Sequence, residues 1–130
     1  MIQELDFHCT LQGANLDPAP LAGTDRFEIL EYSRVGEIAE KGRLKGRPLD
    51  FGYIRFKSRE GDLEEFVNAL YSSRKLIVDN GSEVSALHIL LKYEGQCNWE
   101  IAPSLLKMIG ELGLTLTITC YEANDVNEIK

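Results

Sequence analysis

Apolar side chains recur at every second position in five stretches of the chain, a spacing typical of β-strands. The pattern predicts strands at residues 4–12, 26–32, 50–59, 83–94 and 114–122. In the second stretch, Leu30 breaks the alternation. The fourth is apolar on both faces, which favours a central strand. In the fifth, the predicted core face lies opposite a row of threonines and consists of Leu114, Leu116, Ile118 and Cys120.

Two segments place apolar residues at the three- and four-residue spacing of an amphipathic helix. The first begins at Asp62, which has capping-box spacing with Glu65, and its predicted buried stripe is Leu63, Phe66, Val67 and Leu70. The second has Pro103 in its first turn and Gly113 just past its end, and its predicted stripe is Leu105, Leu106, Ile109 and Leu112. Asp17 and Pro18 predict one further helical turn.

The remaining segments are connections. Residues 36–48 combine glycines, a proline and basic side chains, which predicts an extended exposed loop or an edge hairpin. Asn80-Gly81 is a strong signal for a tight turn before the fourth strand. Residues 124–130 are predicted to be frayed, which leaves a single domain over residues 1–123.

Strands mixed with helices predict an α+β fold, a single-sheet two-layer sandwich with helices on one face, in the ferredoxin-like style. The ends of the chain share a faint order that favours two related β-α-β halves. His8, Leu11, Gly13, Pro18 and Leu21 run in the same order as His88, Leu91, Gly95, Pro103 and Leu105. The alternative is two ordinary strand–helix units that happen to look alike.

Charge is distributed unevenly along the 130 residues. The net charge of −7 and the pI of about 4.8 argue against general binding to nucleic acids or anionic membranes, because both are polyanions. Residues 34–59 depart from this balance, with eight basic and three acidic side chains. This segment therefore carries a local positive charge of +5 within an acidic chain.

The three cysteines are odd in number and have no metal-ligand spacing. Cys9 and Cys120 fall on apolar strand faces and are predicted to be core residues, whereas Cys97 lies in a loop, either inert or as an exposed thiol. The N-terminus lacks the pattern of a secretory signal, and no apolar stretch is long enough to span a bilayer. We therefore expect a cytoplasmic protein that does not contact membranes.

Familiar catalytic and nucleotide-binding motifs are absent from the sequence, including G-x-S-x-G, H-E-x-x-H, G-x-G-x-x-G and Walker A. No cofactor or metal site is predicted. We expect a non-catalytic protein. The alternative is an enzyme with an unfamiliar site, such as a Cys97 thiol that the fold brings to a histidine.

Two surfaces have the composition of a binding site. The first surrounds the loop with the single tryptophan, where aromatic and acidic side chains suit a protein interface: Tyr93, Trp99, Glu100, Tyr121 and Glu122. The alternative is that Trp99 folds back to cover the end of the sheet. The second is a basic face that suits stacked bases and phosphates: Lys41, Arg43, Lys45, Arg47, Tyr53, Arg55, Lys57 and Arg59. Its alternative is a solvated strand whose charges discourage edge pairing.

Three segments carry a resemblance to a known family: FHCTLQGANLDPAPLA, GEIAEKGRLKGRPLDFGYIRF and LLKMIGELGLTLTITCYE. On these residues the chain resembles the uncharacterised bacterial family called domain of unknown function 4279. Tyr53 stands where we expect tryptophan in many relatives. The resemblance implies a single α+β domain of bacterial origin without an established activity. It also implies a similarity to immunity proteins of bacterial toxin systems.

Small size, acidic balance, the lack of catalytic motifs and this resemblance favour a non-catalytic protein-binding module, for example an immunity-type inhibitor. The expected partner is a basic protein or toxin, because opposite charges raise the rate of association. The alternative is a nucleic-acid or phosphorylated-ligand binder that uses the basic face over residues 41–59. The sequence does not predict an oligomeric state.

Overall fold

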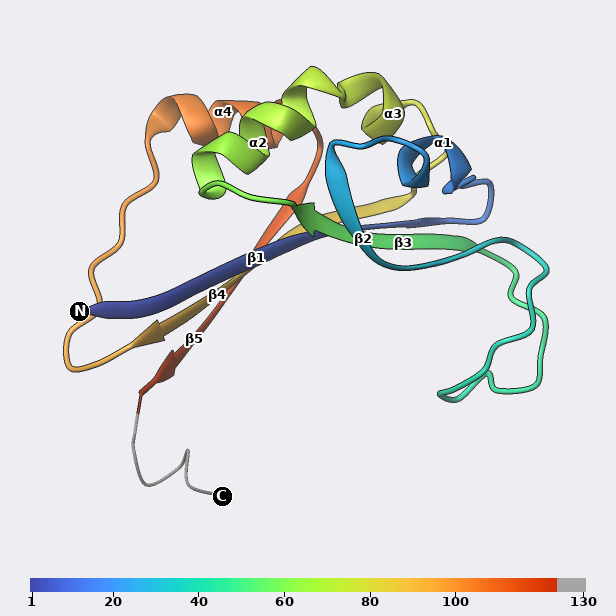
Figure 1. Ribbon diagram of the computed structural model, residues 1–130, viewed down its shortest axis with the longest axis horizontal. Helices are drawn as coiled ribbons and strands as arrows, with labels where there is room; N and C mark the ends of the chain where they lie inside the picture. Colours follow the sequence, from blue (N-terminus) through green and yellow to red (C-terminus); the bar gives the residue numbers. More distant parts are fainter. Residues whose placement is uncertain (124–130) are drawn as a thin grey trace.

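The computed structural model describes residues 1–123, and the segment predicted to be frayed, 124–130, lies outside the described residues. The elements along the chain are β1 (Ile2–Gly13), α1 (Ala19–Ala22), β2 (Phe27–Ser33), β3 (Gly52–Ser58), α2 (Leu63–Ser72), α3 (Arg74–Val78), β4 (Val84–Tyr93), α4 (Pro103–Glu111) and β5 (Thr115–Glu122) (Figure 1). The five predicted strands, the two longer helices and the single turn near Pro18 are present. The short helix α3 was not predicted. No helix within residues 1–123 is long and apolar enough to cross a membrane.

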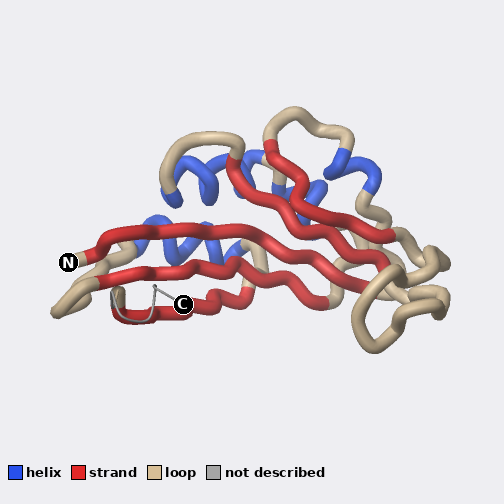
Figure 2. The backbone as a smooth tube through the Cα atoms, turned by 60° about the horizontal axis from the view of Figure 1, so that its bottom comes forward, coloured by secondary structure: helices blue, strands red, loops and turns tan. Residues whose placement is uncertain are grey.

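The strands form one sheet in the order β2-β3-β1-β4-β5 (Figure 2). The first four pair antiparallel, and β5 is added parallel to β4 through α4. From β1 to β4 the chain is therefore a βαββαβ unit, the ferredoxin-like arrangement. The helices lie on one face of the sheet, and the other face is open (Figure 1). The predicted two-layer α+β sandwich is confirmed.

The two β-α-β units at the ends of the chain are built differently. His8 and His88, which open the two similar residue series, pair directly across β1 and β4. However, α1 has 4 residues and α4 has 9. The strand β3 also separates β1 from β2, whereas β4 and β5 are adjacent. The units share an order of elements but not a common geometry.

The core lies between the sheet and the helices. Phe27 of β2, Phe56 of β3 and Phe66 of α2 are fully buried, and their ring centroids lie 4.9, 6.0 and 6.2 Å apart. The capping box of α2 forms as predicted, because Glu65 N donates to Asp62 Oδ1 at 2.9 Å and Asp62 N donates to Glu65 Oε1 at 3.2 Å. The predicted stripe of α2 is buried.

For three residues the prediction of a core position is wrong. Leu106 and Ile118 have 45% and 42% of their surfaces exposed, and Cys120 is also exposed. The position of β5 explains the exposure of Ile118 and Cys120, because β5 is an edge strand at the margin of the sheet, beyond the strands behind which the helices lie (Figure 2). The helix layer ends before this edge. Leu105, Ile109, Leu112 and Leu114 are buried as predicted.

Phe66→Ala removes the α2 ring from its contacts with Phe27 and Phe56. We expect the free energy of unfolding to fall by about 3–5 kcal/mol, the usual cost of truncating a buried phenylalanine. Tyr32→Ala is the control, because Tyr32 is largely exposed and its truncation should cost about 1 kcal/mol or less. Urea unfolding measured by circular dichroism compares the two variants. Equal losses would contradict the assignment of the core.

Candidate functional site

The connection between β2 and β3 forms an irregular hairpin, residues 34–51, that projects from one end of the sheet and curls toward its open face (Figure 1). Backbone hydrogen bonds join its two limbs. Gly36 N donates to Leu49 O at 2.7 Å, Leu49 N donates to Glu37 O at 2.8 Å, and Ala39 N donates to Arg47 O at 3.0 Å. The prediction of an exposed loop or edge hairpin is confirmed.

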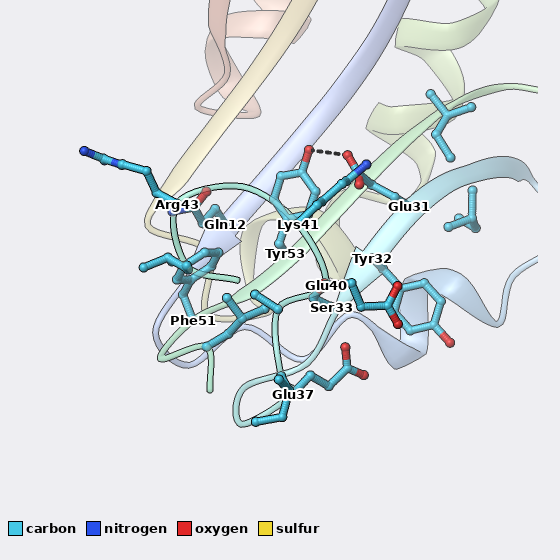
Figure 3. Close-up of a pocket in the computed structure, with 16 residues that line it drawn as sticks. Gln12, Glu31, Tyr32, Ser33, Glu37, Glu40, Lys41, Arg43, Phe51 and Tyr53 are labelled. Atoms are coloured by element: carbon cyan, nitrogen blue, oxygen red, sulfur yellow. Dashed lines mark hydrogen bonds between the residues drawn. The ribbon is translucent and has the colours of Figure 1, made fainter. Parts of the chain in front are cut away.

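A cleft of about 860 Å³ lies between this hairpin and the open face of the sheet (Figure 3). The sheet contributes Gln12 of β1, Tyr53 of β3 and consecutive residues of β2. The hairpin contributes both apolar and charged side chains: Glu37, Ile38, Glu40, Lys41, Arg43, Leu44, Leu49 and Phe51. A cleft of this size and mixed lining is typical of ligand and peptide sites.

A β-bulge brings Leu30 to the cleft. The pairing of β2 with β3 shifts its register between Ile29 and Glu31, which leaves Leu30 as an extra residue. Ile29 keeps its packing against the core, while Leu30 is exposed and lines the cleft. The bulge is the physical reason why Leu30 breaks the alternation in the sequence.

Exposed apolar side chains gather at this end of the molecule. The exposed fractions are 40% for Leu30, 46% for Tyr32, 51% for Val35, 58% for Ile38 and 39% for Leu44. All but Val35 line the cleft. Single exposed apolar residues are normal on protein surfaces, but a group around a cleft indicates a contact surface.

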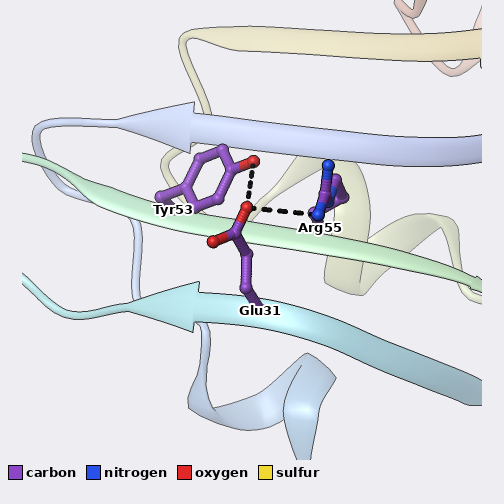
Figure 4. A network of polar contacts seen from close by, with 3 residues as sticks. All are labelled: Glu31, Tyr53 and Arg55. Atoms are coloured by element: carbon purple, nitrogen blue, oxygen red, sulfur yellow. Dashed lines mark hydrogen bonds and ion pairs between the residues drawn. The ribbon is translucent and has the colours of Figure 1, made fainter. Parts of the chain in front are cut away.

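Glu31, Tyr53 and Arg55 form a polar network on the sheet beside the cleft (Figure 4). Tyr53 Oη donates to Glu31 Oε1 at 3.2 Å, and Arg55 Nη2 lies 3.5 Å from the same oxygen. Burial, and next the negative charge of Glu31, raise the pKa of Tyr53, so the phenol stays a neutral donor. Within residues 1–123, Arg55 Nε is buried without a hydrogen-bond partner.

The predicted basic face is not a continuous positive surface. Arg55 pairs with Glu31, and Lys57 lies opposite Glu28 in the register of β2 and β3. Arg59 lies beyond the end of β3, where its Nε donates to the carbonyl of Asp25 at 2.8 Å. On the hairpin, Lys41 and Arg43 line the cleft, and Lys45 and Arg47 are exposed outside its lining.

The predicted tryptophan surface is also divided. Trp99 is half-buried against the core and, with Glu100, borders a second cleft between α2 and α4. Trp99 therefore packs partly against the domain. Tyr93 and Glu122 are register partners across β4 and β5. Tyr121 is the next residue along β5 and so points to the opposite face of the sheet. Cys97 is half-buried and packs against the core.

His8 and His88 stack on the open face. Their ring centroids are 4.8 Å apart with an interplanar angle of 27°. Burial lowers the pKa of His8, followed by the charges of His88 and Arg55. This pair was missed in the sequence, because it depends on the register of two strands that are distant along the chain. Within the described residues, no group of three or more His, Cys, Asp or Glu gathers as metal ligands would.

The apolar hairpin residues were also missed as site residues. Their signal in the sequence is weak, since Val35, Ile38 and Leu44 are spaced singly within a polar, glycine-rich segment. Comparison with known proteins found no matching family model, curated protein or solved structure.

The lowered pKa of His8 makes stability depend on pH. As pH falls below 6.5, the unfolded chain takes up a proton that the folded protein accepts only at lower pH, so stability is lost in that window. Between about pH 7.5 and about pH 5.5, the free energy of unfolding should therefore fall less in His8→Gln than in the wild-type protein. The difference should be below about 1 kcal/mol, because the ring is only partly buried. Urea unfolding at both pH values measures it. An unchanged loss in the variant would contradict the assignment.

Proposed function

We propose that this protein is a non-catalytic protein-binding module whose interface is the cleft between the hairpin 34–51 and the open sheet face. The observation that carries this proposal is the group of exposed apolar side chains that line the cleft: Leu30, Tyr32, Ile38 and Leu44. Their exposure to water is unfavourable, and a partner that covers them gains the free energy of their burial.

The arrangement of side chains around the cleft supports this reading. The hairpin lines the cleft with apolar residues and with charged residues of both signs, the latter being Glu37, Glu40, Lys41 and Arg43. Protein interfaces have this composition, with apolar anchors at the centre and a polar rim. In the proposed complex the partner inserts an apolar side chain into the cleft, and the rim charges set its orientation.

The acidic balance of the chain supports a basic partner. With a net charge of −7, the protein attracts a basic protein over a distance of about a Debye length and raises the rate of encounter. In the form that the resemblance to domain of unknown function 4279 suggests, the partner is a toxin and this protein is an immunity-type inhibitor in the cytoplasm. Inhibition by occlusion requires no catalytic residue, metal or cofactor.

The variant Ile38→Ser with Leu44→Ser tests the interface. Both side chains are exposed, so the fold should be retained while two apolar anchors are lost. We expect a partner captured from the source cells by the wild-type protein, and then purified, to bind the double variant at least about ten-fold more weakly. Isothermal titration measures this affinity.

Val78→Ser is the matched control, because Val78 is an exposed apolar residue on α3, in the helix layer rather than on the open face. Its affinity should equal that of the wild-type protein. If the double variant bound with wild-type affinity, or if both variants lost affinity equally, the cleft would be excluded as the binding interface. A basic partner also predicts slower association as the salt concentration rises.

A single-stranded nucleic-acid binder is the second candidate, and one observation on β3 favours it. The residues Phe51-Gly52-Tyr53-Ile54-Arg55-Phe56 follow closely the F/Y-G/A-F-V-x-F/Y pattern of strands that stack bases in four-stranded RNA-binding sheets. β3 is an interior strand, and Phe51 and Tyr53 line the cleft beside Lys41 and Arg43. The basic residue and glycine that open the RNA-binding pattern are replaced here by Leu49 and Asp50.

Charge places this function second. Glu31 pairs with Arg55, and Glu28 lies opposite Lys57, so the sheet offers little free positive charge to phosphates.

If the protein binds RNA, Tyr53→Ala should weaken binding to a labelled uridine-rich RNA by about 1–3 kcal/mol, the contribution of one stacked base. Tyr121→Ala on β5 is the control. Fluorescence titration at two salt concentrations measures the affinity for RNA. The absence of salt-dependent binding would exclude this function.

A further inference from the structure

The sheet has two edge strands, and only one of them is protected against pairing with another strand. β2 carries Glu28, Glu31 and the bulge at Leu30, and such features discourage pairing at an edge. β5 has neither a bulge nor a charge before Glu122, and it follows β4 in a continuous register. Among the described residues, no strand pairs with the outer edge of β5.

Apolar side chains also lie uncovered on the helix side of this edge. Ile118 and Cys120 are exposed on β5, on the side that Leu116 shares with the core. Leu106 is exposed on α4. Ile118 therefore lies exposed at the edge of the sheet, on the side of the helix layer.

We propose that β5 is a dimerisation edge, at which a second copy of this chain pairs its own β5 in the antiparallel direction. A two-fold axis perpendicular to the sheet relates the two copies. The helix layers then lie on the same side of one continuous sheet, to which each copy contributes its five strands. Ile118 and Cys120 of one copy lie opposite apolar residues of β5 in the other copy across the seam.

The sequence of β5 is complementary to itself, which identifies a second copy as the partner. Threonines occupy its odd positions from Thr115 to Thr119, and apolar residues occupy its even positions from Leu116 to Cys120. Paired residues of an antiparallel dimer share a face of the sheet, so threonine meets threonine and apolar meets apolar. Pairs of both kinds stabilise neighbouring strands.

Charge supports the same partner. Two copies that each carry −7 repel one another, so they associate best through a surface without charge. Residues 112–121 contain no acidic or basic side chain. The dimer also leaves the proposed protein-binding cleft free, because β2 and β5 lie at opposite edges of the sheet. The inference therefore stands independently of the proposed function.

Sedimentation velocity of the full chain over a range of concentrations tests the proposal. We expect the wild-type protein to form a species of twice 14.6 kDa. Ile118→Lys places two positive charges at the seam and should weaken the dimer at least about ten-fold. Leu30→Lys is the matched control, because Leu30 has nearly the same exposed fraction, 40% against 42%, on the opposite edge strand. It should leave the dimer unchanged. Circular dichroism verifies that both variants fold.

Cysteine cross-linking provides a second measurement. In a background with Cys97→Ser and Cys120→Ser, single cysteines at positions 117, 118 and 119 should give a disulfide-linked dimer at one position or more, whereas Leu30→Cys should not. A wild-type monomer at every concentration, or a dimer that Leu30→Lys disrupts and Ile118→Lys does not, would overturn the proposal. So would a monomer that dimerises after deletion of residues 124–130, because the C-terminus would then occupy the edge.

Discussion

The contact among Phe27, Phe56 and Phe66 is the interaction on which the candidate site depends. The three rings come from β2, β3 and α2, so their packing fixes the helix on the sheet and the edge strand on its neighbour. The hairpin 34–51 begins where β2 ends and returns where β3 begins. Since the rings hold these two strands together, the hairpin has fixed attachment points, and the cleft beneath it has a defined floor.

Close backbone contacts at the same end of the sheet restrict its sequence further. A Cβ atom at Gly52 would lie 2.0 Å from the carbonyl oxygen of Leu16, and one at Gly13 would lie 2.4 Å from that of Gly81. Glycine is therefore required at both positions, because the loop after β1 passes close to Gly52 and the loop before β4 passes close to Gly13. Gly52 has this packing role whatever the cleft binds, so the aromatic positions Phe51 and Tyr53 carry the resemblance to RNA-binding strands, and the glycine adds nothing to it.

Local patterns in the sequence predicted most of the helices and strands. The features that they did not predict depend on the tertiary arrangement of these elements. The capping box at Asp62 and the alternation in β1 act between near neighbours, so they are visible in the sequence. The exposure of Ile118 depends on where the helix layer ends, and that is not encoded in the periodicity of β5. The same reason applies to the stacked His8 and His88 and to the cleft, because each combines residues that only the sheet register or the hairpin brings together.

The central position of β1 has a consequence for how the protein is made. β1 precedes the other described elements along the chain, yet it lies between β3 and β4, and the nitrogen of Met1 donates to the carbonyl of Glu94, 93 residues later. The apolar face of β1 has no complete set of neighbours until β4 has emerged. Such long-range pairing slows folding and prolongs the time for which a nascent chain exposes apolar surface. The apolar face of β1 is therefore exposed to aggregation until β4 has been synthesised.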